Sequence, residues 1–143
     1  MINKYPSLFE LIRATLGNKA AEATDFLDLF TEDAVLDYPF APVGTPEQLI
    51  GKANIAAHAT RLAPLLEFGH FTLESVYPLA DAVIFEATCQ GQGSETGLPY
   101  NQRYICVLHL RNGKIARYQD YWNPLILTSA LGGQEAMAKA YAR

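Results

Sequence analysis

The spacing of the apolar residues changes part-way along the chain, and this change limits the fold more than any other sequence feature. Up to about Phe68, apolar side chains recur at the spacing of helices, about 3.6 residues; from about His70 to Asn123 they alternate with the two-residue period of strands. Helices followed by a run of strands are typical of an α+β fold. The 143 residues of the chain suit one such domain and are too few for two.

The sequence predicts three helices. One runs from about Ser7 to Leu16, because Ser7 and Glu10 form a capping box and Gly17 follows as a terminator. Helical spacing of apolar residues indicates a second helix at Ala20–Phe30 and a third at about Lys52–Ala63. These helices are expected to cover one face of a sheet.

Five strands are predicted, at residues 34–38, 70–77, 82–92, 100–111 and 114–123. Pro39 halts the first strand, and the loop after it is rich in proline and glycine, which suits the lip of a pocket. Between the last two strands, Asn112-Gly113 is typical of a type I′ hairpin turn, since both central residues need positive φ.

The two-residue turn sets the pairing of the last two strands. Counting from it gives the pairs Val107 with Tyr118, Ile105 with Asp120 and Arg103 with Trp122. A single β-bulge would reverse this assignment beyond it. Both faces of the hairpin are half apolar, so we expect helices on one face and a second subunit on the outer one, which predicts a homodimer.

One face of this hairpin suits acid–base chemistry. It carries Asp120 between Tyr118 and Trp122, with Arg103 diagonally across. In a closed cavity, desolvation raises the pKa of Asp120 and Arg103 lowers it, and a carboxyl group balanced in this way can serve as general acid or base. The alternative is an ordinary cross-strand ion pair with packing aromatics.

Two further residues are candidates for the same pocket. His58 lies beside Ile55 and Leu62 on the third helix, so it points at the sheet if that stripe is buried. Tyr38 is a better inward residue than its neighbour Asp37, because a phenol combines an apolar ring with a hydroxyl donor. For both residues, a purely structural place in the core is the alternative.

Charge and composition argue against several classes of partner. The net charge is -4 at pH 7 with no cluster of Lys or Arg, so the basic footprint of a protein that binds nucleic acid or an anionic membrane is missing. Apolar runs fall far short of the roughly 18 residues that span a membrane. The segment Met1–Gly17 is unlike a secretory signal, so a cytoplasmic location is expected.

Metals and cofactors are not expected. Cys89 and Cys106 lack the spacing of metal ligands and are predicted to be reduced, buried and inert. Histidines and carboxylates do not stand at ligand spacing, so we assign no metal. Glycine-rich phosphate loops are missing from the sequence, so no nucleotide cofactor is indicated.

Three stretches resemble a known superfamily. They are the string from Phe30 to Pro42, the helix that Gly51 opens, and the segment from Asn112-Gly113-Lys114-Ile115 to Tyr121-Trp122-Asn123-Pro124. Together they are similar to the nuclear transport factor 2-like superfamily, above all to its SnoaL-like polyketide cyclase branch with the phenazine-biosynthesis A/B proteins. The resemblance spans about Leu8 to Pro124, so residues 125–143 form a C-terminal extension that either caps the fold or crosses to a partner.

The resemblance implies a cone, in which a curved, mostly antiparallel sheet wraps around helices and opens at one end as a small-molecule pocket. Members of the superfamily include isomerases, cyclases, dehydratases and non-catalytic binders, and most need no cofactor. In the phenazine-biosynthesis proteins, an acidic residue of the last strand acts as acid and base within a motif Tyr-Arg-Glu-aromatic. The segment Tyr118-Gln119-Asp120-Tyr121 matches that position, with Asp in place of Glu.

The resemblance to ketosteroid isomerase is more distant. The Asp base of that enzyme falls on Tyr38, its second Asp falls near Cys106, and its tyrosine on the first helix has no clear counterpart. Steroid-type isomerisation is therefore not expected.

These observations predict a cofactor-independent enzyme that moves a proton on a small, mostly apolar, carbonyl-containing substrate during isomerisation, cyclisation or condensation. Asp120 would move the proton, with His58 as a second carrier. Arg103 and Tyr38 would hold the substrate oxygen, and Tyr118 and Trp122 would pack the substrate. Two alternatives stay open: a binding protein with the same pocket and no catalysis, and a subunit-interaction module, whose cone would be filled.

Overall fold

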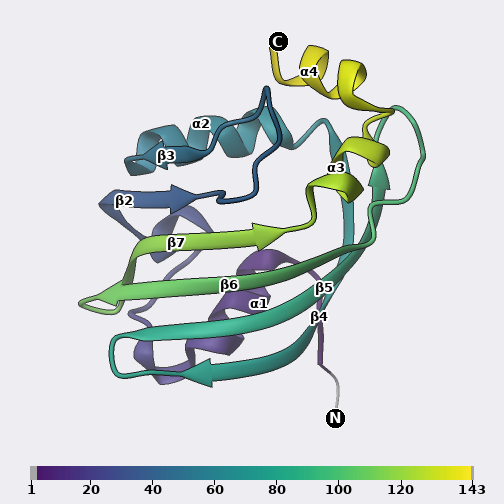
Figure 1. The fold of residues 1–143 in the computed structure, drawn as a ribbon. Coiled ribbons are helices and arrows are strands. Elements are labelled where there is room, and N and C mark those ends of the chain that lie inside the picture. Colours follow the sequence, from purple (N-terminus) through teal and green to yellow (C-terminus); the bar gives the residue numbers. More distant parts are fainter. Residues whose placement is uncertain (1–2, 143) are drawn as a thin grey trace.

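The computed structural model describes residues 3–142, which form one curved sheet with helices on its concave side and at one end (Figure 1). The elements are β1 (Lys4–Tyr5), α1 (Leu8–Leu16), β2 (Phe30–Asp37), β3 (Gln48–Ile50), α2 (Lys52–Leu62), β4 (Leu66–Pro78), β5 (Ala82–Gly93), β6 (Gln102–Arg111), β7 (Lys114–Trp122), α3 (Pro124–Ala130) and α4 (Gln134–Ala142). Within this range the strand order is β1-β4-β5-β6-β7-β2-β3, and only β2 and β7 pair in parallel. The predicted α+β fold with a mostly antiparallel sheet is confirmed.

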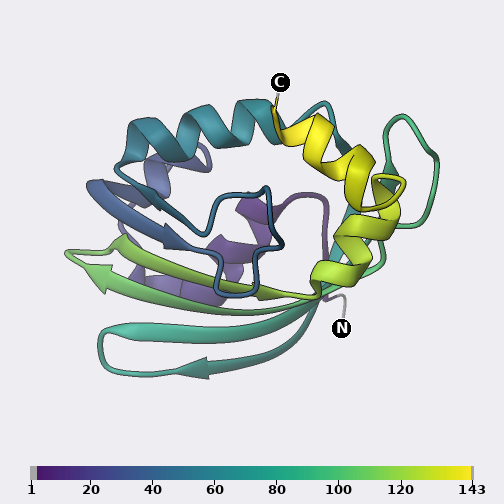
Figure 2. The ribbon, with the colours of Figure 1, turned by 45° about the horizontal axis from the view of Figure 1, so that its top comes forward.

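The sheet wraps around α1, and α2 lies across the opening of the curve (Figure 2). The main core fills the space between them and contains α1 residues Leu11 and Ile12, β5 residues Val83 and Phe85, and Leu108 of β6, all at most 1% exposed. Several residues of this core, among them Leu36, Ile55 and Phe85, also line a pocket inside the cone.

The two predicted helices that frame the core form as expected. The Ser7 hydroxyl accepts a hydrogen bond from the backbone N–H of Glu10 (3.3 Å), which caps α1, and Gly17 ends the helix at φ 55°. Gly51 precedes α2, and its N–H donates to the carbonyl of Ala34 (2.7 Å), which ties the start of this helix to β2. These contacts fix α2 over the sheet.

The helix predicted at Ala20–Phe30 is wrong. Only Leu27–Leu29 form a single 3-10 turn, and Phe30 already begins β2. The side chain of Asp25 accepts the N–H of Asp28 (2.9 Å), and the Asp28 carboxylate accepts the N–H of Thr24 (3.0 Å). These local bonds offer the backbone an alternative to the helix, and the apolar residues pack into the core from a loop.

A bulge corrects the predicted register of β6 and β7. Asn112 and Gly113 form the expected turn at φ 54° and 78°. Beyond the first two pairs, however, Ala116 is an extra residue, because Leu110 pairs with Ile115 and His109 with Arg117. The pairs beyond it are Leu108 with Tyr118, Cys106 with Asp120 and Tyr104 with Trp122, so the predicted pairs Val107–Tyr118, Ile105–Asp120 and Arg103–Trp122 are wrong.

The bulge also decides what lies on the outer face of the sheet. This face carries Arg103, Ile105 and Val107 of β6, and Ile105 is 43% exposed. His109 and Gln119 form a hydrogen bond across the two strands here (2.9 Å). The face is half apolar, as the sequence indicated, and its coverage by a second copy stays a prediction.

The C-terminal extension closes the open end of the cone in this chain (Figure 2). Leu127, Met137 and Tyr141 of α3 and α4 are buried with Leu66 and Tyr100 in a second apolar cluster. In addition, the Gln134 side chain donates to the carbonyl of Val43 in the loop between β2 and β3 (3.2 Å). None of the helices in the described part of the chain is long and apolar enough to cross a membrane.

The hairpin turn provides a test of this fold. At Gly113, φ is 78° and a Cβ atom would lie 2.7 Å from the backbone nitrogen of Ala21, so Gly113→Ala is expected to lower the free energy of unfolding by about 2–3 kcal/mol. Gly97→Ala is the matched control, because φ is 68° there but the space around the Cβ is open; it should cost about 1 kcal/mol. Urea denaturation measures both, and equal costs would contradict the close contact at Gly113.

Candidate active site

A cavity of about 490 Å³ lies inside the cone, within the range of roughly 300–1,000 Å³ that small-molecule pockets occupy. Its wall consists mainly of apolar side chains from the helices and the concave face of the sheet. The lining residues that carry polar atoms are Ser7, Tyr38, Thr45, His58, Tyr100, Tyr104, Cys106, Tyr118, Asp120, Trp122 and Tyr141. Among the described lining residues, Asp120 is the only acid, and neither Lys nor Arg is present.

Asp120 extends from β7 into this cavity, between the inward side chains of Tyr118 and Trp122. Burial raises the pKa of its carboxyl group from 3.8 to about 7, although a hydrogen bond from Cys106 works in the opposite direction. Because the described lining residues include neither Lys nor Arg, no positive charge offsets the effect of burial on this pKa. At neutral pH the carboxyl group can therefore both accept and donate a proton.

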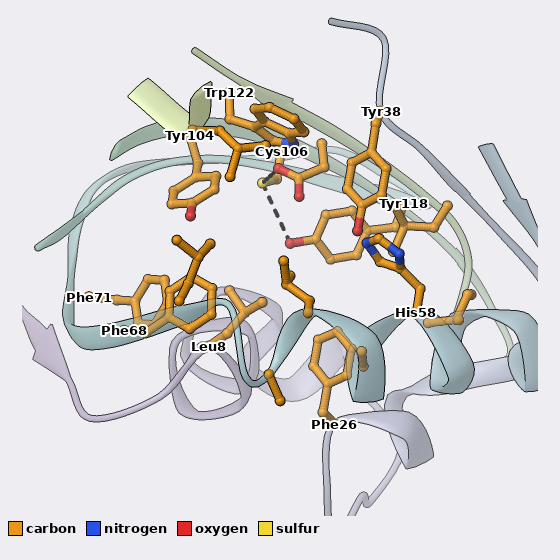
Figure 3. A pocket seen from close by; sticks show the side chains of 18 of the residues that line it. Leu8, Phe26, Tyr38, His58, Phe68, Phe71, Tyr104, Cys106, Tyr118 and Trp122 are labelled. Carbon is orange, nitrogen blue, oxygen red and sulfur yellow. Dashed lines mark hydrogen bonds between the residues drawn. The ribbon is translucent and has the colours of Figure 1, made fainter. Parts of the chain in front are cut away.

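Two neighbours link to this carboxyl group in a chain of hydrogen bonds. The Cys106 thiol donates to Asp120 Oδ1 (3.3 Å), and the Tyr118 hydroxyl donates to Cys106 Sγ (3.6 Å; Figure 3). Burial raises the pKa values of Cys106 and Tyr118 well above their ordinary values, so both stay protonated and remain donors. The second carboxylate oxygen, Oδ2, has no hydrogen bond among the described residues and keeps accessible surface.

A second pair of phenols lies in the cavity wall. The hydroxyl groups of Tyr100 and Tyr104 are 2.9 Å apart and hydrogen bonded to each other. Burial raises the pKa values of Tyr100 and Tyr104 well above the ordinary value of 10.0, so both are neutral. In such a pair one hydroxyl donates to the other, which leaves one O–H free to donate to a ligand oxygen.

The rings of Tyr38 and His58 lie against each other in the cavity wall. Their ring centroids are 5.6 Å apart, and Tyr38 also contacts Trp122 edge-on at 5.8 Å (Figure 3). His58 lies beside Tyr141 of α4 at 6.2 Å. Burial, with the positive charge of Arg61, lowers the pKa of His58 below 6.5, so the imidazole is neutral at pH 7.

The structure brings together five of the six residues that the sequence singled out: Tyr38, His58, Tyr118, Asp120 and Trp122 all line the cavity. The predicted contact between Arg103 and Asp120 is wrong. Arg103 is exposed on the outer face, because the bulge reverses the inward side of β6 relative to β7. The cavity therefore lacks the cation that the sequence analysis assigned to it.

Cys106 takes a place that the sequence did not predict. Both cysteines are free and buried, as expected, but Cys106 donates to the central carboxylate instead of serving only as a small apolar residue. The sequence signal that was available is the alternation Tyr104-Cys106-Leu108, a stripe apolar enough to be the inward face. Among the described residues, no group of three His, Cys, Asp or Glu side chains is arranged to hold a metal ion.

Comparison with known proteins agrees with this architecture. The model of the SnoaL-like domain matches residues 13–118, which is well over half of the chain. The chain belongs to the SnoaL-like family. Solved structures described as NTF2-like share the fold with this SnoaL-like protein at 13% and 17% identity, with TM-scores of 0.67 and 0.61, which agrees with the predicted α+β fold.

Relatives of this SnoaL-like protein extend over most of its length. It is similar to the uncharacterised protein YesE of Bacillus subtilis, with 38% identity over 136 residues, or 93% of this chain and 92% of the relative. An uncharacterised PhzA/B-like protein of Pseudomonas aeruginosa is 40% identical over 120 residues, covering 82% and 84%. A Bacillus subtilis crystal structure, described as a "putative isomerase", has a TM-score of 0.75 at 40% identity and covers 85% and 92%.

The raised pKa of Asp120 predicts how stability depends on pH. The folded pKa of about 7 lies above the unfolded value of 3.8, so the contribution of this group is fully present below 3.8 and is lost as the pH rises through about 7. Over that range the wild-type protein should lose free energy of unfolding relative to Asp120→Asn, on the order of 2 kcal/mol because water reaching the cavity screens part of the effect. Urea denaturation at several pH values measures it.

Asp33→Asn is the control with the opposite sign. The hydrogen bond from Arg111 lowers the pKa of Asp33, so its contribution is lost only as the pH falls below 3.8. Between pH 3.8 and pH 7, the free energy of unfolding of this variant should change with pH in the same way as that of the wild type. Parallel curves for the wild type and Asp120→Asn in the same range would contradict the burial of an ionisable group at position 120.

Proposed function

We propose that this SnoaL-like protein is a cofactor-independent acid–base enzyme that moves a proton on a small, uncharged, largely apolar carbonyl compound. The observation that carries this proposal is the placement of Asp120, the sole acid among the described lining residues, in an apolar cavity where burial raises its pKa to about 7. A general base works best when its pKa lies near the working pH, so this carboxyl group is tuned for proton transfer. Isomerisation, cyclisation and condensation all use such a step.

In the proposed reaction, Oδ2 of Asp120 accepts a proton from the carbon next to the substrate carbonyl. The electron pair of the broken C–H bond moves into the carbonyl group, which becomes an enolate oxygen. Asp120, now protonated, returns the proton to another atom of the substrate or to its product. No oxidant, reductant or other reactant is needed, because the proton removed from the substrate is also the one returned.

Neutral phenols of the cavity supply the donors that an enolate oxygen needs. Tyr38 has a hydroxyl group that faces the cavity, and the Tyr100–Tyr104 pair has one O–H free for a ligand. His58 is neutral at pH 7 and can serve as the second proton carrier. In this proposal Tyr118 and Trp122 pack the substrate, and the role predicted for Arg103 passes to the phenols.

The charge of the cavity limits the class of substrate. A carboxylate or phosphate group would be buried beside Asp120 with no described cation to neutralise it, which is costly in an apolar site. An uncharged ketone meets only neutral donors and apolar surface. We therefore propose that the substrate carries no ionised acid group at the end that enters the cone.

A ligand pair tests this preference. At a pH above 7, tetralone should bind at least about tenfold more tightly than tetralin carboxylate, because only the second places a charge beside ionised Asp120. In Asp120→Asn the ratio of the two dissociation constants should be smaller, since the negative charge of Asp120 no longer repels that of the ligand carboxylate. Isothermal titration calorimetry measures the four dissociation constants, and a preference of the wild type for the carboxylate would contradict the proposal.

Elimination of a nitro-substituted benzisoxazole tests the base itself, because this neutral, apolar probe needs only removal of a C–H proton to break its N–O bond. We expect wild-type kcat/KM to rise with pH through a midpoint of about 7. In Asp120→Asn it should fall by about 100-fold or more. The absorbance of the phenolate product gives the rate.

The matched control is Asp33→Asn, which removes an exposed carboxylate paired with Arg111 and should leave the rate unchanged. Equal rates for the wild type and Asp120→Asn would remove Asp120 from the mechanism. If the wild type binds tetralone but shows no elimination that depends on Asp120, the alternative of a non-catalytic binding protein is favoured. A subunit-interaction module agrees less well with the structure, because that alternative predicts a filled cone.

A further inference from the structure

Among the described residues, the carboxyl group of Asp120 has one hydrogen-bond donor, and that donor is a thiol. Cys106 Sγ donates to Oδ1 across 3.3 Å, and the two residues are directly paired on β6 and β7. Cys106 is 1% exposed, so its position is fixed by the core on one side and by the carboxyl group on the other. A thiol in this position does more than fill space.

We propose that Cys106 is a positioning residue for the base: its thiol holds Oδ1 of Asp120 and thereby leaves Oδ2 as the oxygen that exchanges protons with the substrate. The inference rests on the proposed function, and it concerns how the base is oriented. Oδ1 can accept the S–H bond in both protonation states, as a carboxylate oxygen or as the carbonyl oxygen of the acid. The carboxyl group therefore need not rotate when it gains or loses a proton.

The Tyr118 hydroxyl sets the direction of this chain. It donates to Cys106 Sγ (3.6 Å), and its ring stacks on Phe30 at 6.1 Å, which fixes the phenol in the core. Because the sulfur accepts from Tyr118, its own proton is directed at Asp120. The order is thus Tyr118 to Cys106 to Asp120, with every proton pointing toward the base.

The weakness of the thiol as a donor explains why a cysteine suits this position. A strong donor such as a hydroxyl group would stabilise the carboxylate more and make it a poorer base. A residue without a donor would leave the carboxyl group free to rotate and would raise its pKa further. The thiol is an intermediate case, which orients the base and keeps it active near neutral pH.

Cys106 does not act as a nucleophile in this proposal. Burial and the neighbouring Asp120 raise the pKa of its thiol well above the ordinary value of 9.0, so the reactive thiolate is not formed at neutral pH. The geometry supports a hydrogen-bonding role, in which Cys106 Sγ accepts from Tyr118 and donates to Asp120.

Other titratable groups around Asp120 must be separated from its own titration. They are Tyr38 in the loop after β2, His58 of α2, Tyr100 in the loop before β6, Tyr104 of β6, Tyr118 of β7 and Tyr141 of α4. Burial raises the pKa of each phenol above its ordinary value of 10.0, that of Tyr141 to about 12, and burial lowers the pKa of His58 below 6.5. The carboxyl group of Asp120 is therefore the only one of these groups expected to titrate near pH 7.

The test follows this carboxyl group directly, by carbon-13 NMR of protein labelled at the aspartate side chains, with the Asp120 signal identified by its loss in Asp120→Asn. Cys106→Ser should move the midpoint to lower pH, since its hydroxyl is a stronger donor. Cys106→Ala and Cys106→Val should move it to higher pH, each by about half a pH unit or more. These two variants bracket the volume of the thiol, so a common upward shift reports the lost donor and not a change in hydration.

Two further variants complete the design. Tyr118→Phe keeps the thiol but removes the hydrogen bond that orients it. The Asp120 midpoint should therefore move upward by less than in Cys106→Ala. If the Cys106 variants fold poorly, the upward shift in Tyr118→Phe still tests the chain of hydrogen bonds. Cys89→Ala is the matched control, because Cys89 is an equally buried free thiol whose hydrogen bond goes to the carbonyl of Gln90. It should leave the midpoint unchanged.

The outcomes separate this inference from the proposed function. An Asp120 midpoint that stays the same in all Cys106 variants and in Tyr118→Phe, or one that moves in the same direction for Ser and Ala, overturns the positioning role. The benzisoxazole elimination can still depend on Asp120 in that case, and the proposed function then stands. If the midpoint shifts as expected and elimination shows no dependence on Asp120, the proposed function fails, and the positioning role fails with it.

Discussion

The site depends on one physical constraint, the burial of a carboxyl group in an apolar cavity without a cation. Taking Asp120 out of water favours its neutral form, and the one described donor to it is the weak thiol of Cys106. A Lys or Arg in the wall would return the carboxyl group to its ordinary acidity and make it a poor base. The raised pKa of Asp120 therefore depends on the absence of Lys and Arg from the described lining as much as on the residues that are present.

A single extra residue in β7 produces this arrangement. The Asn112-Gly113 turn fixes where the last hairpin begins. The bulge at Ala116 then shifts the register by one residue, so that each β7 side chain beyond it shares a face with a different set of β6 side chains. Without the bulge, Arg103 would share a face with Asp120, and the two would form an ion pair. With it, Cys106 lies opposite Asp120 and the arginine is on the outer face, in solvent. The bulge thus decides whether Asp120 forms an ion pair with Arg103 or stays without a cation and has a raised pKa.

The same bulge shows where sequence reasoning ends. The turn, the two framing helices and the four long strands follow from local signals, because caps, glycines and alternation act within a few residues. The bulge at Ala116 has no such signal, so the cross-strand partners of Asp120 could not be predicted, even though Asp120, Tyr118 and Trp122 were correctly grouped by their alternation on one strand. The segment after Gly17 failed for a related reason: its apolar spacing fits a helix, but Asp25 and Asp28 bind backbone N–H groups instead.

The resulting cavity can carry an anionic intermediate without gaining charge. In the proposed reaction, the negative charge is on Asp120 before proton transfer; afterwards it is on the enolate oxygen of the substrate, and Asp120 is neutral. The apolar wall therefore surrounds one charge throughout, and the reaction only moves it from a carboxylate toward the neutral phenols of Tyr38, Tyr100 and Tyr104. Because these donors are already placed, little reorganisation is needed when the charge arrives. A cationic side chain would instead stabilise the starting carboxylate, which lowers the driving force for removing the proton.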